Sequence, residues 1–108
     1  MVWKVEFFIN NRLDKPVSQF LRLLDDATLH KVFKVINLLG DQGPALTLPY
    51  AKRITKTIFE LRTTGKTPIR VLYARKGTIF VLLHAFKKKT NKLPVKELKL
   101  AESRFDSL

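Results

Sequence analysis

The sequence predicts an α+β fold in which a small antiparallel sheet packs on an N-terminal helical hairpin and a further helix follows the sheet. Two observations predict this class. Strand-like segments, alternating or continuously apolar, stand at the start and in the second half of the chain, and two segments with helical apolar spacing lie between them. The length of 108 residues, 45% of them hydrophobic, suits a single domain over residues 1–108.

The N-terminal elements follow from periodicity and capping. A strand is predicted over residues 2–9, because apolar and polar side chains alternate there. A first helix begins at Pro16, since Pro is favoured at the first helical position, and its apolar residues recur every three or four positions up to Leu24. A second helix is capped by the pair Asp25-Asp26 and is expected to end at Gly40.

The second half of the chain supplies the rest of the sheet. Residues 41–56 are predicted to form a connecting loop. Three strands are predicted over residues 57–62, 69–73 and 78–86, which are rich in β-branched and aromatic side chains and are separated by turns. A last helix starts at Pro94. One face of this sheet would stay partly open, which makes it a candidate binding surface.

Positive charge dominates the chain and is concentrated in the sheet half. There are 21 Lys and Arg residues against 9 Asp and Glu, for a net charge of +12. Between residues 42 and 96 the one acidic residue is Glu60. A basic run can serve solubility alone, but this one-sided distribution favours contact with a polyanion such as RNA or the ribosome.

Several classes of site and location are not expected. Cys is absent and His30 and His84 are the two histidines, so neither a disulfide nor a metal site is predicted, and no cofactor is implied. The opening residues 1–6 do not resemble a signal peptide, and no stretch of about 18 apolar residues occurs. A cytoplasmic protein is therefore expected.

Strand alternation places the candidate functional side chains. Glu60 and Arg62 share one face of their strand, and Arg70 is expected to project from the open face. His84 is expected to share a side with Leu82, Phe86 and Lys88. Glu60 is either a general base or, as we favour, a counter-ion for Arg62. His84 is either a proton carrier or a hydrogen-bonding residue at the edge of the core.

Cleavage of RNA needs a base for the ribose 2′-hydroxyl, a cation for the phosphoryl oxygens and an acid for the 5′-oxygen. Of these three roles Arg can fill only the second, that of the cation, because it does not deprotonate in proteins. A Lys crowded by other cations can carry a proton, as can His84. The candidate catalytic residues are Arg70, Lys87, Lys88 and His84, and the candidate RNA-binding residues are Arg62, Lys66, Lys89 and Lys92.

The order of several motifs also resembles a known family. The motifs are Ile58-Phe59-Glu60-Leu61-Arg62, Ile69-Arg70-Val71-Leu72-Tyr73 and Leu82-Leu83-His84-Ala85-Phe86-Lys87-Lys88-Lys89-Thr90, followed by Leu93-Pro94 and a helix. This arrangement, over nearly the whole chain, resembles the phage-derived HigB-like branch of the RelE/ParE toxin superfamily. The resemblance implies a RelE-like fold whose sheet enters the ribosomal A site and cleaves bound mRNA.

The resemblance also implies partners and roles. It implies the toxin of a type II toxin–antitoxin pair, neutralised by a cognate antitoxin with a helix-turn-helix domain. Relatives contact the scissile phosphate through an Arg and through basic residues after the last strand, which correspond here to Arg70, Lys87 and Lys88. Many relatives carry a catalytic Tyr near the C-terminus, whereas no Tyr follows Tyr73 here. The alternative is a ParE-like gyrase inhibitor without ribonuclease activity, or an RNA-binding or ribosome-binding module.

Overall fold

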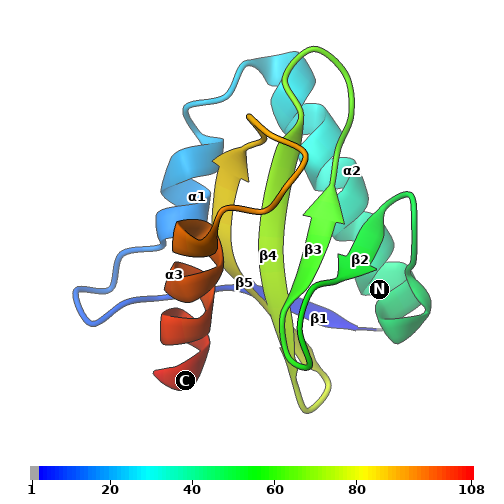
Figure 1. Cartoon of the computed structure of the whole chain (residues 1–108). Helices are drawn as coiled ribbons and strands as arrows, with labels where there is room; N and C mark the ends of the chain where they lie inside the picture. Colours follow the sequence, from blue (N-terminus) through cyan, green and yellow to red (C-terminus); the bar gives the residue numbers. More distant parts are fainter. Residues whose placement is uncertain (1–2) are drawn as a thin grey trace.

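The computed structural model describes residues 3–108, which form a five-stranded sheet with helices on both faces (Figure 1). The elements in chain order are β1 (Lys4–Phe7), α1 (Pro16–Leu21), α2 (Asp26–Gln42), a 3-10 helix (Gly43–Ala45), β2 (Ala51–Arg53), β3 (Phe59–Arg62), β4 (Ile69–Lys76), β5 (Ile79–Lys87) and α3 (Val95–Asp106). The mixed α+β class predicted from the sequence is confirmed. Val2, where the predicted first strand began, lies outside the described residues.

The strand order is β1-β5-β4-β3-β2, and it corrects the prediction in two ways. First, the sheet is mixed rather than antiparallel, because β1 pairs in parallel with β5 while the other neighbours are antiparallel. A parallel pair needs a long crossover, which the chain between β1 and β5 supplies. Second, residues 41–56 are not all loop, because they contain the 3-10 helix and the edge strand β2.

One face of the sheet is covered by α1 and α2. Val17 and Leu21 of α1 and the buried face of α2 pack on Leu61, Val71 and other side chains of the sheet. The N-terminal helical hairpin that we expected is not confirmed. The sheet begins before the helices, with β1, and the two helices rest on different strands: α1 contacts β5, whereas α2 crosses β1 and β3.

The beginning of α2 matches the sequence prediction, but its end does not. Asp25 is the N-cap, and its carboxylate accepts a hydrogen bond from the Thr28 amide at 2.7 Å. Gly40 does not end the helix. It lies inside α2, where its carbonyl accepts a hydrogen bond from the amide of Trp3, and the helix continues to Gln42. Gly43 ends it with a φ of +56°, and a Cβ there would clash with the Trp3 indole.

A β-bulge in β5 decides which side chains face the site. Leu72 pairs with His84, but Tyr73 pairs with Leu82, so Leu83 is an extra residue in β5. The extra residue reverses the alternation beyond it. Leu82 therefore points to the α2 side, and His84 lies opposite Leu72, on the α3 side. The prediction that His84 shares a side with Leu82 was wrong for this reason.

The other face of the sheet is partly covered by α3, which packs over β4 and β5 (Figure 1). Ala101 of α3 is fully buried against a second apolar cluster that includes Leu72, Val81 and Leu83. This face is not covered along its whole length, and the uncovered end carries the candidate site. Within residues 3–108, no helix combines the length and the apolar character needed to cross a lipid bilayer.

Candidate active site

A cleft of about 360 Å³ lies at the uncovered end of the sheet, on the same face as α3. Its floor is formed by side chains of β3 and β4, and its wall is the segment that connects β5 to α3. The lining residues are Phe20, Lys52, Ile54, Glu60, Arg62, Arg70, Phe86, Lys87, Lys88, Lys89, Thr90, Asn91, Lys92, Leu93, Pro94 and Glu97. Cations outnumber the two carboxylates among them, so the cleft is suited to a polyanion.

Strand register builds the floor from a row of residues that crosses β3, β4 and β5 and is extended by Tyr50, just before β2. Arg62 of β3 is paired with Arg70 of β4, which is paired with Phe86 of β5. Tyr50 extends the row beyond Arg62, since the Arg62 amide donates a hydrogen bond to the Tyr50 carbonyl at 2.8 Å. Cross-strand partners share a face of the sheet. The row therefore places two guanidinium groups beside the ring of Phe86 in the cleft, and Tyr50 lies beyond Arg62 in a neighbouring pocket.

A second row lies two residues along the strands from the first. Lys52, Glu60, Leu72 and His84 are paired in order across β2, β3, β4 and β5. This row supplies the carboxylate of the floor and brings Lys52 to the cleft. The missed strand β2 explains why Lys52 was not predicted, because a strand of only three residues, Ala51–Arg53, shows no measurable alternation.

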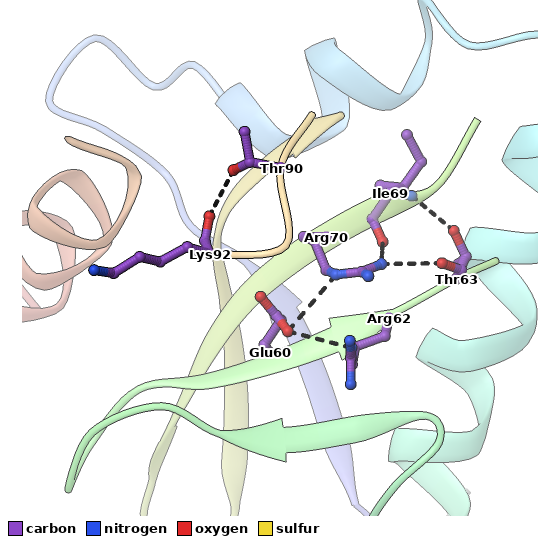
Figure 2. Close-up of polar contacts among 7 residues, drawn as sticks. All are labelled: Glu60, Arg62, Thr63, Ile69, Arg70, Thr90 and Lys92. Atoms are coloured by element: carbon purple, nitrogen blue, oxygen red, sulfur yellow. Dashed lines mark hydrogen bonds and ion pairs between the residues drawn. The ribbon is translucent and has the colours of Figure 1, made fainter. Parts of the chain in front are cut away.

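Glu60 is a shared counter-ion for both arginines of the floor (Figure 2). Its Oε1 lies 3.4 Å from Nε of Arg62 and 3.7 Å from Nε of Arg70. The prediction that Glu60 is a counter-ion for Arg62 is confirmed. Glu60 also forms an ion pair with Arg70, which was not predicted from the sequence.

Arg70 is buried rather than projecting, which corrects the sequence prediction. The residue is only 6% exposed. Its Nη1 donates hydrogen bonds to the carbonyls of Thr63 at 3.0 Å and Ile69 at 3.2 Å, as Figure 2 shows. Burial lowers the pKa of Arg70, and Glu60 opposes that shift. No fully buried side-chain nitrogen or oxygen in the described residues lacks a partner, so Nη2, for which no hydrogen bond is found, retains access to the cleft.

The wall of the cleft is a lysine-rich segment held by backbone contacts. The amide of Lys88 donates a hydrogen bond to the Pro68 carbonyl at 2.9 Å, which ties the end of β5 to the start of β4. Thr90 Oγ1 donates to the Lys92 carbonyl at 2.8 Å and shapes the turn (Figure 2). The lysines of this segment therefore border the cleft on a defined backbone.

His84 is held beside the cleft by α3. Its Nε2 lies 3.0 Å from Oε1 of Glu97, and its Nδ1 lies 3.4 Å from Nη1 of Arg104. Arg104 is a donor only, so Nδ1 must accept and Nε2 must carry the proton that faces Glu97. Burial lowers the pKa of Arg104, whose Nη1 also donates to the Leu83 carbonyl at 2.8 Å. His84 thus touches Glu97, and Glu97 lines the cleft.

The structure brings together most of the predicted site residues. Those that line the cleft are Arg62, Arg70, Lys87, Lys88, Lys89 and Lys92. Two do not line it: Lys66 lies on the loop between β3 and β4, and His84 is engaged with Glu97 and Arg104. Sequence reasoning missed Glu97, because a lone Glu on a predicted amphipathic helix is ordinarily a solvated surface residue. In the part of the chain that the structure describes, no group of three or more acidic, His or Cys side chains is placed to hold a metal ion.

The chain thus combines a small α+β sheet with a basic cleft at the uncovered end of one sheet face. Residues 19–106 match the family described as phage derived protein Gp49-like (DUF891), and the chain belongs to this family. The family is related to the RelE/HigB-like toxins of toxin–antitoxin systems. A comparison with curated proteins finds no match.

Proposed function

We propose that this chain is the toxin of a type II toxin–antitoxin pair and that it is a ribosome-dependent mRNA endoribonuclease. The observation that carries the proposal is the floor of the cleft, where Arg62 and Arg70 lie side by side on adjacent strands. Two arginines fixed before the substrate arrives can stabilise the charge that develops on phosphoryl oxygens, at no cost of reorganisation. The family relationship supports the same function.

The cleft also carries groups that suit RNA in particular. Phe86 presents an aromatic ring beside the arginines, and single-stranded RNA is bound by stacking of its bases on aromatic side chains. The lysines at positions 87, 88, 89 and 92 line the wall and are suited to the phosphates on either side of the cleavage point.

The proposed reaction is an attack of the ribose 2′-oxygen on the adjacent phosphorus. The bond from phosphorus to the 5′-oxygen breaks, which leaves a 2′,3′-cyclic phosphate and a free 5′-hydroxyl. A base must take the 2′-hydroxyl proton, and an acid must give a proton to the leaving 5′-oxygen. Arg62 and Arg70 stabilise the phosphoryl oxygens.

Two groups are assigned to proton transfer. Glu60 is committed to two arginines, whereas Glu97 reaches the cleft from α3 with one oxygen bonded to His84. We therefore assign the base to Glu97 and treat His84 as a positioning residue. Lys87 or Lys88, at the end of β5, is the proposed proton donor to the leaving group, because a Lys among other cations gives up its proton more readily.

The composition of the site supports dependence on the ribosome. Of the two carboxylates that line the cleft, Glu60 is paired with Arg62 and Arg70, which leaves Glu97 as the single proposed base. An intrinsic activity on free RNA should be low, and a ribosome that holds mRNA in a reactive geometry would supply the missing orientation. A function on translating ribosomes places the chain in the cytoplasm.

The proposed partner is a cognate antitoxin with a helix-turn-helix domain. A chain with a net charge of +12 is attracted to any polyanion, so a specific inhibitor needs acidic residues and apolar contacts as well. Its surface toward this chain is therefore expected to be acidic.

The test is cleavage of an mRNA on programmed ribosomes by the purified chain, with the products mapped and their ends analysed. We expect cuts in ribosome-bound mRNA that leave 2′,3′-cyclic phosphate ends, little cleavage of the same mRNA without ribosomes, and loss of cleavage in Arg62→Ala. Rapid and specific cleavage of naked mRNA would reject ribosome dependence. Growth arrest with intact mRNA and altered DNA supercoiling would reject the ribonuclease in favour of gyrase inhibition.

A further inference from the structure

A second pocket adjoins the cleft and shares Arg62 with it. This pocket has a volume of about 240 Å³ and lies where α2 meets the edge of the sheet. Its lining residues are Lys31, Lys34, Val35, Pro49, Tyr50, Arg62, Thr63 and Thr64. Among these described residues none is acidic, so the pocket continues the positive potential of the cleft toward α2.

Tyr50 is placed in this pocket by the backbone of the sheet. It immediately precedes β2 and is held opposite Arg62 by the hydrogen bond from the Arg62 amide to the Tyr50 carbonyl, at 2.8 Å. Tyr50 is 41% exposed, which is high for a large aromatic residue beside a sheet. The ring is thus available to a ligand, whereas the ring of Tyr73, which is 3% exposed, is not.

The spacing of the row indicates how RNA would lie on it. Tyr50 and Phe86 are the two ends of the row, with Arg62 and Arg70 between them. Neighbouring strands are about 4.8 Å apart, so the three intervals separate the two ends by roughly 14 Å. Stacked bases of one strand lie about 3.4 Å apart, so two neighbouring nucleotides can reach both rings only with their bases splayed.

We propose that Tyr50 is a stacking platform for the base of a nucleotide that neighbours the nucleotide in the cleft, and that Lys31 and Lys34 contact the phosphate of that neighbour. The proposal rests on the proposed function, because it takes single-stranded RNA as the ligand. Nζ of Lys31 is 3.4 Å from the Thr64 carbonyl, which holds this ammonium group at the wall of the pocket. Bases would then be splayed to either side of the two arginines.

The test compares probes that fill one pocket with probes that fill both. The short probe is a nucleoside 3′,5′-bisphosphate, and the long probe is a 2′-O-methyl hexanucleotide, which cannot be cleaved through its 2′-oxygen. Affinity is measured at low salt by calorimetry for the wild-type chain and for three variants. Tyr50→Leu removes the ring, Tyr50→Phe keeps it, and Phe33→Leu removes a different ring that is also 41% exposed but lies in another pocket.

We expect Tyr50→Leu to weaken binding of the hexanucleotide about tenfold or more, which is the ordinary effect of losing one stacked base. The same variant should bind the bisphosphate as the wild type does. Tyr50→Phe and Phe33→Leu should bind both probes normally. In proton NMR spectra, the Tyr50 ring signals should move upfield when the hexanucleotide binds, and those of buried Tyr73 should stay in place.

The outcomes separate this inference from the proposed function. If Tyr50→Leu binds the hexanucleotide with wild-type affinity, while changing Lys87, Lys88 and Lys89 to Gln weakens it, the stacking role of Tyr50 is rejected and the RNA site in the cleft stands. If the wild-type chain binds neither probe at low salt, RNA recognition by both pockets is rejected. If Tyr50→Phe is as weak as Tyr50→Leu, the hydroxyl rather than the ring makes the contact, and the stacking role is also rejected.

Discussion

Arg62 and Arg70 lie directly opposite each other on β3 and β4, and the Nε atoms of both reach the same oxygen of Glu60, at 3.4 and 3.7 Å. Two guanidinium groups in adjacent cross-strand positions repel each other unless a counter-ion lies between them. Glu60 is that counter-ion, and it is buried at 6% exposure in the floor of the cleft. The pair of cations that we propose for phosphate binding is therefore assembled within the fold itself, which requires a buried cluster of charges.

The first prediction concerns the stability of this cluster. Arg70→Ala should lower the free energy of unfolding by about 3 kcal/mol, because it leaves the buried Glu60 carboxylate without one of its partners. Arg62→Ala should lower it by less than about 1 kcal/mol, since the Arg62 side chain is 30% exposed and its pairing is screened by water. Urea denaturation of both variants is the measurement. Equal stability of the two variants would show that the buried contacts of Arg70 do not support the fold.

An activity assay of Arg70→Ala has to separate two effects of this substitution. Loss of growth arrest in Arg70→Ala has two sources, a missing cation and a weakened fold. Arg62→Ala removes a cation from the same floor and keeps the fold, so it isolates the first source. Comparing the two variants at equal concentration of folded protein, set by circular dichroism, separates them.

The second prediction concerns the lysines at the end of β5. Changing Lys87, Lys88 and Lys89 together to Gln should weaken RNA binding and reduce the slope of log affinity against log salt by about 2, because a single strand releases about 0.7 counterions per neutralised phosphate. The matched control changes Lys4, Lys76 and Lys99, which are exposed and outside the cleft, and so alters net charge equally. A filter-binding titration between low and physiological salt measures both slopes. Identical slopes would remove the 87–89 run from the interface.

Much of the fold was predictable because strands and helices of ordinary length carry a clear apolar period. β1, β3, β4, β5 and all three α-helices coincide with predicted segments, with ends that differ by a few residues. The failures have local causes. β2 is too short for alternation to show, and Phe80–Ala85 is interrupted only by His84, so its apolar pattern does not reveal the bulge at Leu83. Nothing in the period of α2 distinguishes Gly40 from Gly43 as its end.

The candidate site was predictable in its charge and not in its geometry. The one-sided distribution of Lys and Arg located the basic surface, and alternation put Glu60 beside Arg62. Burial of Arg70 depends on the carbonyls of Thr63 and Ile69, which only the folded backbone brings together. The contact of His84 with Glu97 joins a strand to a helix and has no sequence signature.

The third prediction concerns stability at high pH. Burial raises the pKa of Tyr73 from 10.0 to about 12, and its ring packs against Phe59 and Phe80. The pKa of Tyr73 is therefore higher in the folded chain than in the unfolded chain. The protonated Tyr73 stabilises the fold fully below pH 10, and this stabilisation is lost as the pH rises toward 12. Two pKa units correspond to about 2 to 3 kcal/mol.

The measurement is the free energy of unfolding in urea from pH 9 to pH 12. Tyr73→Phe should lose less stability than the wild type over this range, by roughly the amount given above. Parallel curves for Tyr73→Phe and the wild type would mean that the folded chain accommodates the ionised Tyr73 side chain without a cost in stability.

The fourth prediction tests whether His84 acts through Glu97. Glu97→Gln should lower kcat for cleavage of ribosome-bound mRNA by at least about a hundredfold, the usual effect of removing a general base, and leave KM nearly unchanged. His84→Phe keeps an aromatic ring beside Phe86, on which His84 stacks at 5.6 Å, but removes the donor to Glu97. Its kcat should fall by a smaller factor, because the carboxylate remains but is no longer held in place.

The double variant decides between a positioning role and an independent one. If His84 serves only to orient Glu97, then His84→Phe should cost nothing further once Glu97 is Gln, and kcat of the double variant should equal that of Glu97→Gln. His84→Gln, which retains an N–H donor near the position of Nε2, should recover part of the activity lost in His84→Phe. Multiplicative losses in the double variant would instead show that His84 acts independently of Glu97, and the positioning role would be rejected.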